Sequence, residues 1–360
     1  MADPKSYSEH QAAMALQLEQ TTVALAQFAK AANLAPVMVR GLVLVAEYSP
    51  YIVLVRRKIE SRHGTATTDT ANALVDATNV QFLSTDTDKV IYNSSTSRWG
   101  VVTAYVSTSQ LTLGNDLFPD GDENYKIYNK GCKDNRQVNI SGFPGYTKIK
   151  RAEYPVGTER KVDSDINGIV QIGYDGVMPD SSTVDADDEN VVVHLYLKRR
   201  HFISQLTTFT GTVKTTAAVA ATSIIFTGLT NDDLLLKGQP FTIAGVPGEY
   251  TVTDNASKVT STEVTVSFFP GLECEATAAD AVTLTQSTLT PELEEIFDDW
   301  CAGKMMENKG ATLSVKGFIN AASTIKASDN WSEKVMAKAE AKLQQIAIRD
   351  SEPIPVLARY

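Results

Sequence analysis

Apolar side chains near the start of the chain recur at the spacing of one helical face. Met14 and Leu18 are four residues apart and open a pattern that predicts an amphipathic helix. A second helical segment is expected to begin at Pro36, because proline is tolerated in the first turn of a helix. Pro50 is expected to break or kink that segment, since it lacks a backbone donor. The pattern predicts that residues 6–63 are helical.

The same spacing returns in residues 289–349. Thr290 offers a capping hydroxyl and Pro291 suits the first helical position, so a helix is expected to begin here. A last helix is expected to start near Asp329. Both ends of the chain therefore carry apolar stripes, and we expect their helices to pack together although they are far apart in sequence. The stripe behind Pro291 consists of Leu293, Ile296, Phe297 and Trp300.

The middle of the chain has the pattern of strands. Runs of β-branched and aromatic residues occur at 99–106, 191–197, 239–244 and 263–268. In the run that begins at 191, alternate apolar residues share one face and His194 lies on the other. We therefore expect short strands here, with His194 as a polar-face residue.

An internal repeat is also present in the middle. Residues 64–128 and 211–285 each begin with a Gly-Thr pair, at Gly64 and Gly211, and each continues through about six strand-like segments. This order of parts predicts two small β-modules with a similar strand order.

The remaining residues, 1–63, 129–210 and 286–360, are predicted to form one parent domain, with the modules inserted at loop tips, which tolerate insertion best. The predicted fold class is α+β: a discontinuous helical-bundle adaptor domain with a small central β-sheet and two inserted small all-β modules.

Composition and charge narrow the class of protein. The chain has 360 residues, of which 43% are hydrophobic and 21% charged, as in a globular protein. The net charge is −10, and nearly all of it falls within 64–288, which argues against a dedicated nucleic-acid coat. The most apolar stretch, 37–55, is interrupted by Arg40, Glu47 and Pro50 and is too short for a membrane span. No apolar run follows the first residues, so we expect no signal peptide.

No motif for catalysis, metal binding or phosphate binding stands out. The four histidines, His10, His63, His194 and His201, lack the spacing of metal ligands, and Cys301 has no histidine near it in sequence. Three scattered cysteines favour neither a disulfide framework nor a zinc site. We therefore expect no catalytic residues, no metal and no cofactor.

Two acidic clusters are candidate calcium sites, and two basic clusters are candidate phosphate contacts. The acidic stretches at 120–124 and 180–190 lack the spacing of a calcium loop, so solvated loops are favoured over calcium sites. The basic clusters at 56–58 and 198–201 end apolar segments. Emergence of the chain into water is favoured there over contact with phosphate.

Several segments together resemble the head–tail connectors (adaptors) of tailed bacteriophages. They are AEYSPY at 46–51, YPVGTER at 154–160, GIVQI at 168–172, NVVVHLY at 190–196 and TLTPEL at 288–293. The Gly-Thr-rich modules look like β-domains spliced into phage virion proteins. The resemblance covers most of the chain as an order of parts. The two large insertions and the long N-terminal helical region depart from it.

The resemblance implies a non-enzymatic virion protein of the phage neck, made in the host cytoplasm. Its implied partners are further copies of itself in a ring of twelve, the portal protein, and a tail or nozzle protein. Genomic DNA would pass through the ring without sequence-specific binding, and no membrane would be involved.

Two other functions stay open from the sequence. One is a fibre or decoration protein that binds carbohydrate through its β-modules, for which exposed aromatic residues are expected. The candidates are Trp99, Tyr105 and Tyr125, although packing in the core is the favoured interpretation of all three. The other is a carbohydrate-active enzyme, which would need a pair of carboxylates in a cleft.

The C-terminal tail yields the first testable prediction. Pro353 and Pro355 favour an extended chain, and an extended chain loses less entropy on docking than a flexible one. We predict that the tail binds the portal or a neighbouring subunit; the alternative is a tail folded back on its own helices. Deletion of 351–360 should then leave the monomer folded but weaken assembly, as measured by native mass. Full-strength rings on the portal would contradict this role. The predicted contact residues are Ile354, Pro355, Val356, Leu357, Arg359 and Tyr360.

Overall fold

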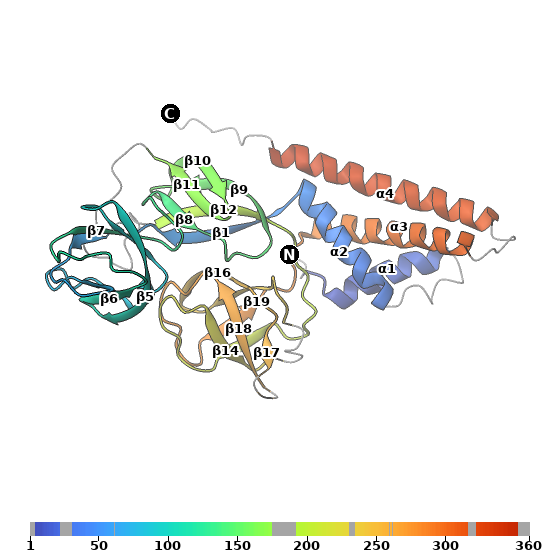
Figure 1. Ribbon diagram of the computed structural model, residues 1–360. Coiled ribbons are helices and arrows are strands. Elements are labelled where there is room, and N and C mark those ends of the chain that lie inside the picture. The colour runs from blue at the N-terminus through green and yellow to red at the C-terminus, as the bar shows by residue number, and fades with distance from the viewer. Residues whose placement is uncertain are drawn as a thin grey trace, which may run out of the picture.

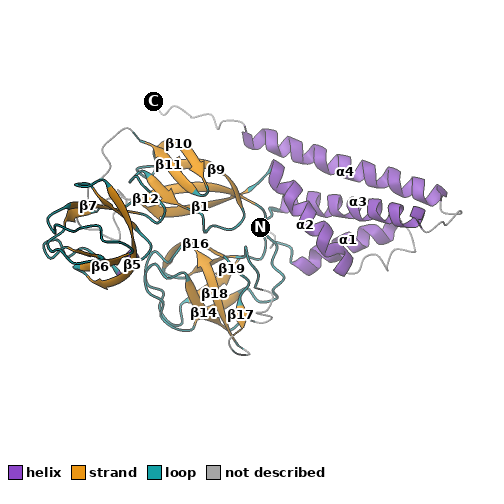
Figure 2. Ribbon diagram, in the orientation of Figure 1, coloured by secondary structure: helices purple, strands orange, loops and turns teal. Residues whose placement is uncertain are grey.

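The computed structural model describes residues 4–21, 31–60, 62–174, 192–229, 235–258, 260, 262–315 and 322–351. Within these ranges the chain forms four α-helices and nineteen strands, and the strands pair antiparallel in three sheets. The helices form a stem at one end of the molecule, and the sheets occupy the other end (Figures 1 and 2). The tail residues 352–360, including the predicted contact residues, lie outside the described ranges.

Each group of elements is continuous in space but not in sequence. The stem contains α1 (Tyr7–Thr21), α2 (Ala31–Tyr48), α3 (Pro291–Val315) and α4 (Ala322–Ser351). The central sheet contains β1 (Tyr51–Lys58), β8 (Gln137–Asn139), β9 (Tyr146–Glu153), β10 (Glu159–Ile166), β11 (Ile169–Gly173) and β12 (Val192–Arg199), in the order β1-β12-β9-β10-β11-β8.

The other two sheets form what we call the first and second β-modules. The first contains β2 (His63–Thr65), β3 (Ala73–Val75), β4 (Val90–Asn93), β5 (Arg98–Ser107), β6 (Gln110–Leu113) and β7 (Asn124–Tyr128). The second contains β13 (Thr210–Val213), β14 (Ser223–Thr227), β15 (Pro240–Ile243), β16 (Val246–Val252), β17 (Ser257–Lys258), β18 (Glu263–Phe269) and β19 (Ala281–Leu284).

The stem joins the two ends of the chain, as the sequence predicted. Its core contains Met14 and Leu18 from α1 together with Phe297 and Trp300 from α3. Helix α2 ends at Tyr48, just before Pro50, which confirms the predicted break. The helices approach closely at Gly41, where an added Cβ would lie 2.6 Å from the Sγ of Cys301. A shared apolar core therefore holds the two ends of the chain together.

A buried polar contact fixes α1 against α3 within the stem. The Nδ1 atom of His10 lies 2.7 Å from Oδ1 of Asp298, and the Nζ of Lys5 donates to the other oxygen of that carboxylate at 2.7 Å. The His10 ring also meets Phe297 edge to face. Since His10 and Asp298 are almost wholly buried, this pair sets the position of α1 along α3.

The predicted fold class is wrong, because the protein is mostly β and is not a helical-bundle adaptor. Residues 51–58, predicted as helix, form β1, in which Val53 and Val55 face inward and Leu54 faces outward. A short apolar run does not distinguish a strand from a buried helix by periodicity alone. The central sheet also has its own core, so it is a separate layer rather than an attachment to a bundle.

The two β-modules have the same cyclic strand order, which confirms that part of the repeat prediction. We number the strands of each module 1 to 6 in chain order and leave out the short β17 of the second module. The strands of the first module then pair in the order 1-6-3-4-5-2. Those of the second pair as 2-1-6-3-4-5, with a further pairing of β14 with β18 that closes the circle. The Gly-Thr pairs also correspond, since Gly64 pairs with Tyr125 on the last strand of its module and Gly211 with Val282 on the last strand of the other. Whether the modules fold as independent insertions with the predicted boundaries stays a prediction.

Phe297 tests the shared core of the stem. Its side chain is fully buried, and Phe297→Ala is expected to lower the free energy of unfolding by about 3–5 kcal/mol through lost burial and a new cavity. Denaturant unfolding followed by circular dichroism measures this loss. Lys338→Ala is the control, because Lys338 is exposed on α4 and should change stability by less than about 0.5 kcal/mol. A loss at Phe297 as small as that at Lys338 would rule out a shared core.

Candidate functional site

A row of four side chains crosses the outer face of the first β-module. His63, Lys126, Tyr92 and Trp99 are successive cross-strand neighbours on β2, β7, β4 and β5. His63, Lys126 and Trp99 are exposed, and Tyr92 is half-buried. Side chains directly opposite each other on one face of a sheet lie close enough to interact. The row is therefore one continuous surface.

Three aromatic rings gather at one end of this row. The rings of Tyr92 and Trp99 lie 4.3 Å apart, centroid to centroid, at 33° to each other, and Tyr128 lies 5.8 Å from Trp99 at 35°. The Nζ of Lys133 lies 6.0 Å from the Trp99 ring. Trp99 keeps 40% of its surface exposed. We call these three residues the Trp99 platform; its tilted rings can receive another flat, partly apolar ring.

The aromatic candidates from the sequence lie in different environments. Trp99 is exposed, as a binding residue must be, whereas Tyr125 is buried and Tyr105 packs half-buried against the module core. Tyr92 and Tyr128 complete the platform and were missed. Their alternation with buried residues along β4 and β7 was the available signal, but the pairing of these strands with β5 was needed to bring them to Trp99.

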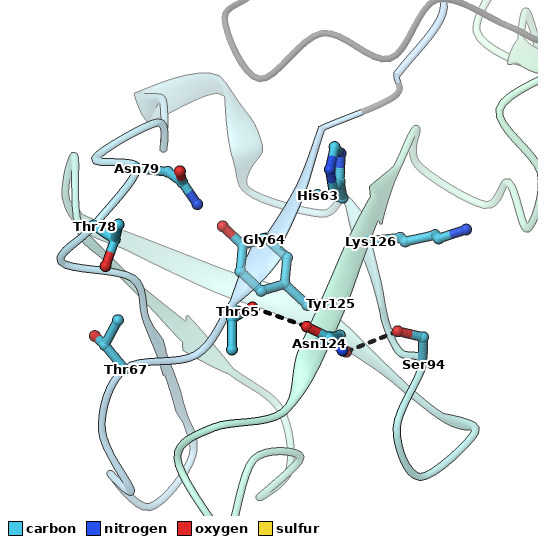
Figure 3. A pocket seen from close by; sticks show the side chains of 10 residues that line it. All are labelled: His63, Gly64, Thr65, Thr67, Thr78, Asn79, Ser94, Asn124, Tyr125 and Lys126. Atoms are coloured by element: carbon cyan, nitrogen blue, oxygen red, sulfur yellow. Dashed lines mark hydrogen bonds between the residues drawn. The ribbon is translucent and has the colours of Figure 1, made fainter.

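A notch lies at the other end of the row, with a cavity of about 670 Å³ (Figure 3). Hydroxyl and amide groups make up most of its lining, and none of the described residues that line it carries a carboxylate. In Figure 3 the Thr65 hydroxyl donates to Asn124 (2.8 Å), and the Ser94 hydroxyl donates to the carbonyl of Asn124 (3.1 Å). The lining residues are His63, Gly64, Thr65, Thr67, Thr78, Asn79, Ser94, Asn124, Tyr125 and Lys126.

The notch exists because the strands beside it separate. The N–H of Thr67 donates to the carbonyl of Val75 at 2.8 Å, and the corresponding contact in the second module joins Lys214 to Ile225 at 2.9 Å. Beyond that point β14 continues along β13, with Phe226 opposite Val213. In the first module the next residue is Asp76, and the chain turns away there. Among the described strands, none pairs with this edge of β2, whereas the second module is closed at the corresponding position.

Asp76 holds that turn and lies buried beneath the lining of the notch, where it forms a polar floor together with Tyr125. Its Oδ1 accepts from the N–H groups of Thr78 (3.0 Å) and Asn79 (2.9 Å), and its Oδ2 accepts from the Tyr125 hydroxyl (2.6 Å). Burial opposes ionisation of Asp76, but these hydrogen bonds outweigh it and lower its pKa. Burial and the bond to Asp76 raise the pKa of Tyr125. The floor is thus a fixed, ionised hydrogen-bond network.

A side chain at position 64 would fill the floor of the notch. An added Cβ on Gly64 would lie 2.6 Å from Oδ2 of Asp76 and 2.7 Å from the Tyr125 hydroxyl. Close packing therefore requires glycine at this position. The Gly-Thr pair that marks the start of the first module thus also keeps the notch open.

A buried ion cluster anchors the base of the first β-module. The Nε of Arg62 donates to Oε1 of Glu60 at 2.9 Å, and its Nη1 donates to Oδ2 of Asp86 at 3.0 Å. The Nζ of Lys89 lies 2.6 Å from Oε2 of Glu60. Burial disfavours the Glu60 carboxylate, but Lys89 and Arg62 outweigh it and lower its pKa to about 2. Two cations and two anions therefore balance within the protein.

Other histidine and cysteine candidates lie in separate parts of the molecule. His10 belongs to the stem, and His194 lies half-buried on the polar face of β12, as predicted. His201 is buried; its Nε2 lies 2.7 Å from the carbonyl of Ser49 and its Nδ1 lies 3.0 Å from that of Thr288. Cys301 is buried, and burial raises its pKa well above the ordinary value. In the described structure these side chains are packed within the protein.

The basic clusters also differ from expectation. Arg56 pairs with Glu273 of the second module at 2.8 Å, and Arg199 is buried, with its Nη1 donating to Thr251 at 3.0 Å. The predicted emergence into water is therefore wrong for Arg199, whereas Arg200, the next residue, is exposed. Arg56 and Arg199 join the central sheet to the second module. The acidic stretch at 180–190 lies outside the described residues, and that at 120–124 forms the turn before β7.

The described ranges contain neither a membrane-spanning helix nor a cluster of metal ligands. None of the helices there has the length and apolarity needed to cross a membrane. In the same ranges, no three His, Cys, Asp or Glu side chains come together in a way that could hold a metal ion. Comparison of the chain with family models, with curated proteins and with solved structures gave no match in any of the three.

Arg62 provides a test of the anchor beneath the site. Arg62→Met leaves Glu60 and Asp86 buried without this cation, so the free energy of unfolding is expected to fall by about 3–5 kcal/mol. Arg98→Met is the matched control, because Arg98 is an exposed arginine of the same module and should be nearly neutral. Urea unfolding at neutral pH measures both, and equal effects would exclude an anchoring role.

The same cluster predicts an acid dependence of stability. The pKa of Glu60 is about 2 in the folded protein against an ordinary value of 4.5, so its contribution is complete above pH 4.5 and is lost as the pH falls toward 2. Glu60→Gln should therefore be less stable than the parent at neutral pH and show a shallower loss between pH 4.5 and 2. Parallel stability curves for the two proteins would contradict this assignment.

Proposed function

We propose that the protein is a structural virion subunit that assembles into a ring through its helical stem, in the manner of a head-to-tail connector. The observation that carries this proposal is the set of large aliphatic side chains that three stem helices expose. Leu16 of α1 is 57% exposed, Val39 of α2 is 62% exposed and Ile348 of α4 is 62% exposed. A neighbouring subunit that covered these side chains would remove apolar surface from water.

The architecture supports this assignment of roles. The core of the stem joins both ends of the chain, and the first β-module lies at the opposite end of the molecule, whereas the second lies below the central sheet (Figure 1). Ring contacts through the stem would leave the first module free at the periphery. The proposed partners are the portal protein and a tail or nozzle protein. An acidic chain of net charge −10 also suits a lumen through which DNA passes without tight phosphate binding.

Native mass tests the ring. The full-length protein is expected to elute as a ring many times the 39.1 kDa of one chain, and to appear as rings in negative-stain micrographs. The double variant Leu16→Glu with Val39→Glu should be folded and monomeric, because two buried charges would oppose the stem contact. Light scattering on a sizing column measures both masses.

Ile166→Glu is the matched control for that experiment. Ile166 is 66% exposed but lies on β10 of the central sheet, so its replacement should leave the ring intact. A monomeric parent protein at every concentration would refute the ring. A ring that survives the double variant would move the contact away from the stem.

The Trp99 platform favours a second candidate function, binding of carbohydrate by a decoration or fibre protein. Aromatic faces stack on the apolar face of a sugar ring, and the hydroxyl and amide groups of the notch suit sugar hydroxyls. Because Asp76 is held beneath the notch with its oxygens occupied, the arrangement suits binding rather than acid–base chemistry. Binding of oligosaccharides to the full-length chain tests this function.

A further inference from the structure

We propose that the Trp99 platform and the notch form one site for an acidic glycan, with a sugar ring on Trp99 and a sugar carboxylate at Lys126. This inference rests on the second candidate function and adds the ligand class. The register of strands β2, β7 and β4 supports this proposal, because Lys126 lies directly opposite both Tyr92 of the platform and His63 of the notch. A chain of sugars bound to both parts must therefore pass over the Lys126 ammonium group.

The charge around the platform is positive although the chain as a whole is acidic. Lys126 is exposed on β7 opposite Tyr92 of the platform, and the Nζ of Lys133 lies over the Trp99 ring. Among the residues that the structure describes, two carboxylates of this module and the adjoining loop have partners within the protein. Asp76 accepts hydrogen bonds within the floor, and Asp134 pairs with Arg136 at 2.8 Å. The exposed cations are thus available to an anionic ligand.

The notch supplies the groups that recognise a sugar rather than another anionic polymer. Its lining offers hydroxyl or amide groups from Thr65, Thr78, Asn79 and Asn124, which both donate and accept hydrogen bonds as sugar hydroxyls do. A peptide strand added to β2 would have a three-residue edge, and the carbonyl of His63 already accepts from Gln81 at 2.8 Å. Nucleic acid would need a longer basic track than these few side chains provide.

The test uses the full-length protein and two matched probes. Hexagalacturonate is compared by calorimetry with its fully methyl-esterified form, which keeps the sugar backbone and removes the charge. The same protein is screened on an array of uronic-acid, sialic-acid and neutral oligosaccharides, and against oligo-dT at the same salt concentration. Acidic glycans are expected to bind at least about threefold more tightly than their neutral partners, the scale of one exposed ion pair.

Three variants locate the site. Trp99→Ala should weaken binding about tenfold through loss of stacking, and Trp99→Phe should restore most of it. Lys126→Met should weaken binding of acidic glycans about threefold to fivefold and that of neutral glycans by less, so that the preference for acidic glycans is lost. Lys161→Met is the control, because Lys161 is a highly exposed lysine on β10, away from the platform, and should have no effect.

The outcomes separate the two levels of the proposal. Equal binding of acidic and neutral glycans, lost in Trp99→Ala, would overturn the acidic preference and keep the carbohydrate function. No binding to any glycan on the array would overturn both. Glycan binding that is unchanged in Trp99→Ala and Lys126→Met would overturn the site. Binding of oligo-dT in place of glycans, with the same dependence on Trp99, would assign the surface to single-stranded nucleic acid.

Discussion

The antiparallel pairing of β1 with β12 is the constraint on which the rest of the structure depends. Eight consecutive register pairs join Tyr51–Lys58 to Val192–Arg199, two segments that are far apart in the sequence. At the Tyr51 end the chain continues into the stem and the second β-module, and at the Lys58 end it continues into the first β-module. A shift of this register by one residue would turn Val53 and Val55 out of the core and displace every part attached to the pair.

Each end of that pair is fixed by buried polar contacts. At the stem end, His201 lies between the carbonyls of Ser49 and Thr288, so it joins the end of α2 to the segment that enters α3. At the other end, Glu60 and Arg62 tie the chain to Asp86 of the first module. Buried polar groups are costly unless they are paired, so these contacts make one orientation of the attached parts more favourable than others. The stem and the first β-module are therefore held in a fixed orientation relative to the β1–β12 pair, in addition to being linked to it by the chain.

The two β-modules differ in one strand pairing. That pairing closes the second module into a barrel, and the first module, which lacks it, has an open seam. Both have the same cyclic strand order, but Phe226 continues β14 into the core of the second module, where it is fully buried. Asp76 follows the equivalent hydrogen bond in the first module and turns the chain instead. A short polar side chain can accept hydrogen bonds from the two following N–H groups, whereas phenylalanine cannot. The notch follows from that local difference, and the platform beside it follows from the register of β4, β5 and β7.

The sequence by itself determined the local features that rest on short-range physics. It predicted the helix that ends before Pro50, the helix that begins at Pro291, the polar face of His194 and the repeated strand order. Proline geometry, capping and alternation act within a few residues, so they can be seen without the fold. Trp99 was also identified as a candidate for an exposed aromatic contact.

Only the tertiary structure decided which segments pair and what they bring together. Residues 51–58 form a strand because β12 supplies a partner, which a local apolar pattern cannot reveal. Arg199 is buried because the second module covers it, and the row from His63 to Trp99 requires four strands to be in register. Hydrogen bonds between distant strands and burial by another module depend on long-range contacts. The fold class and the composition of the site therefore had to come from the structure.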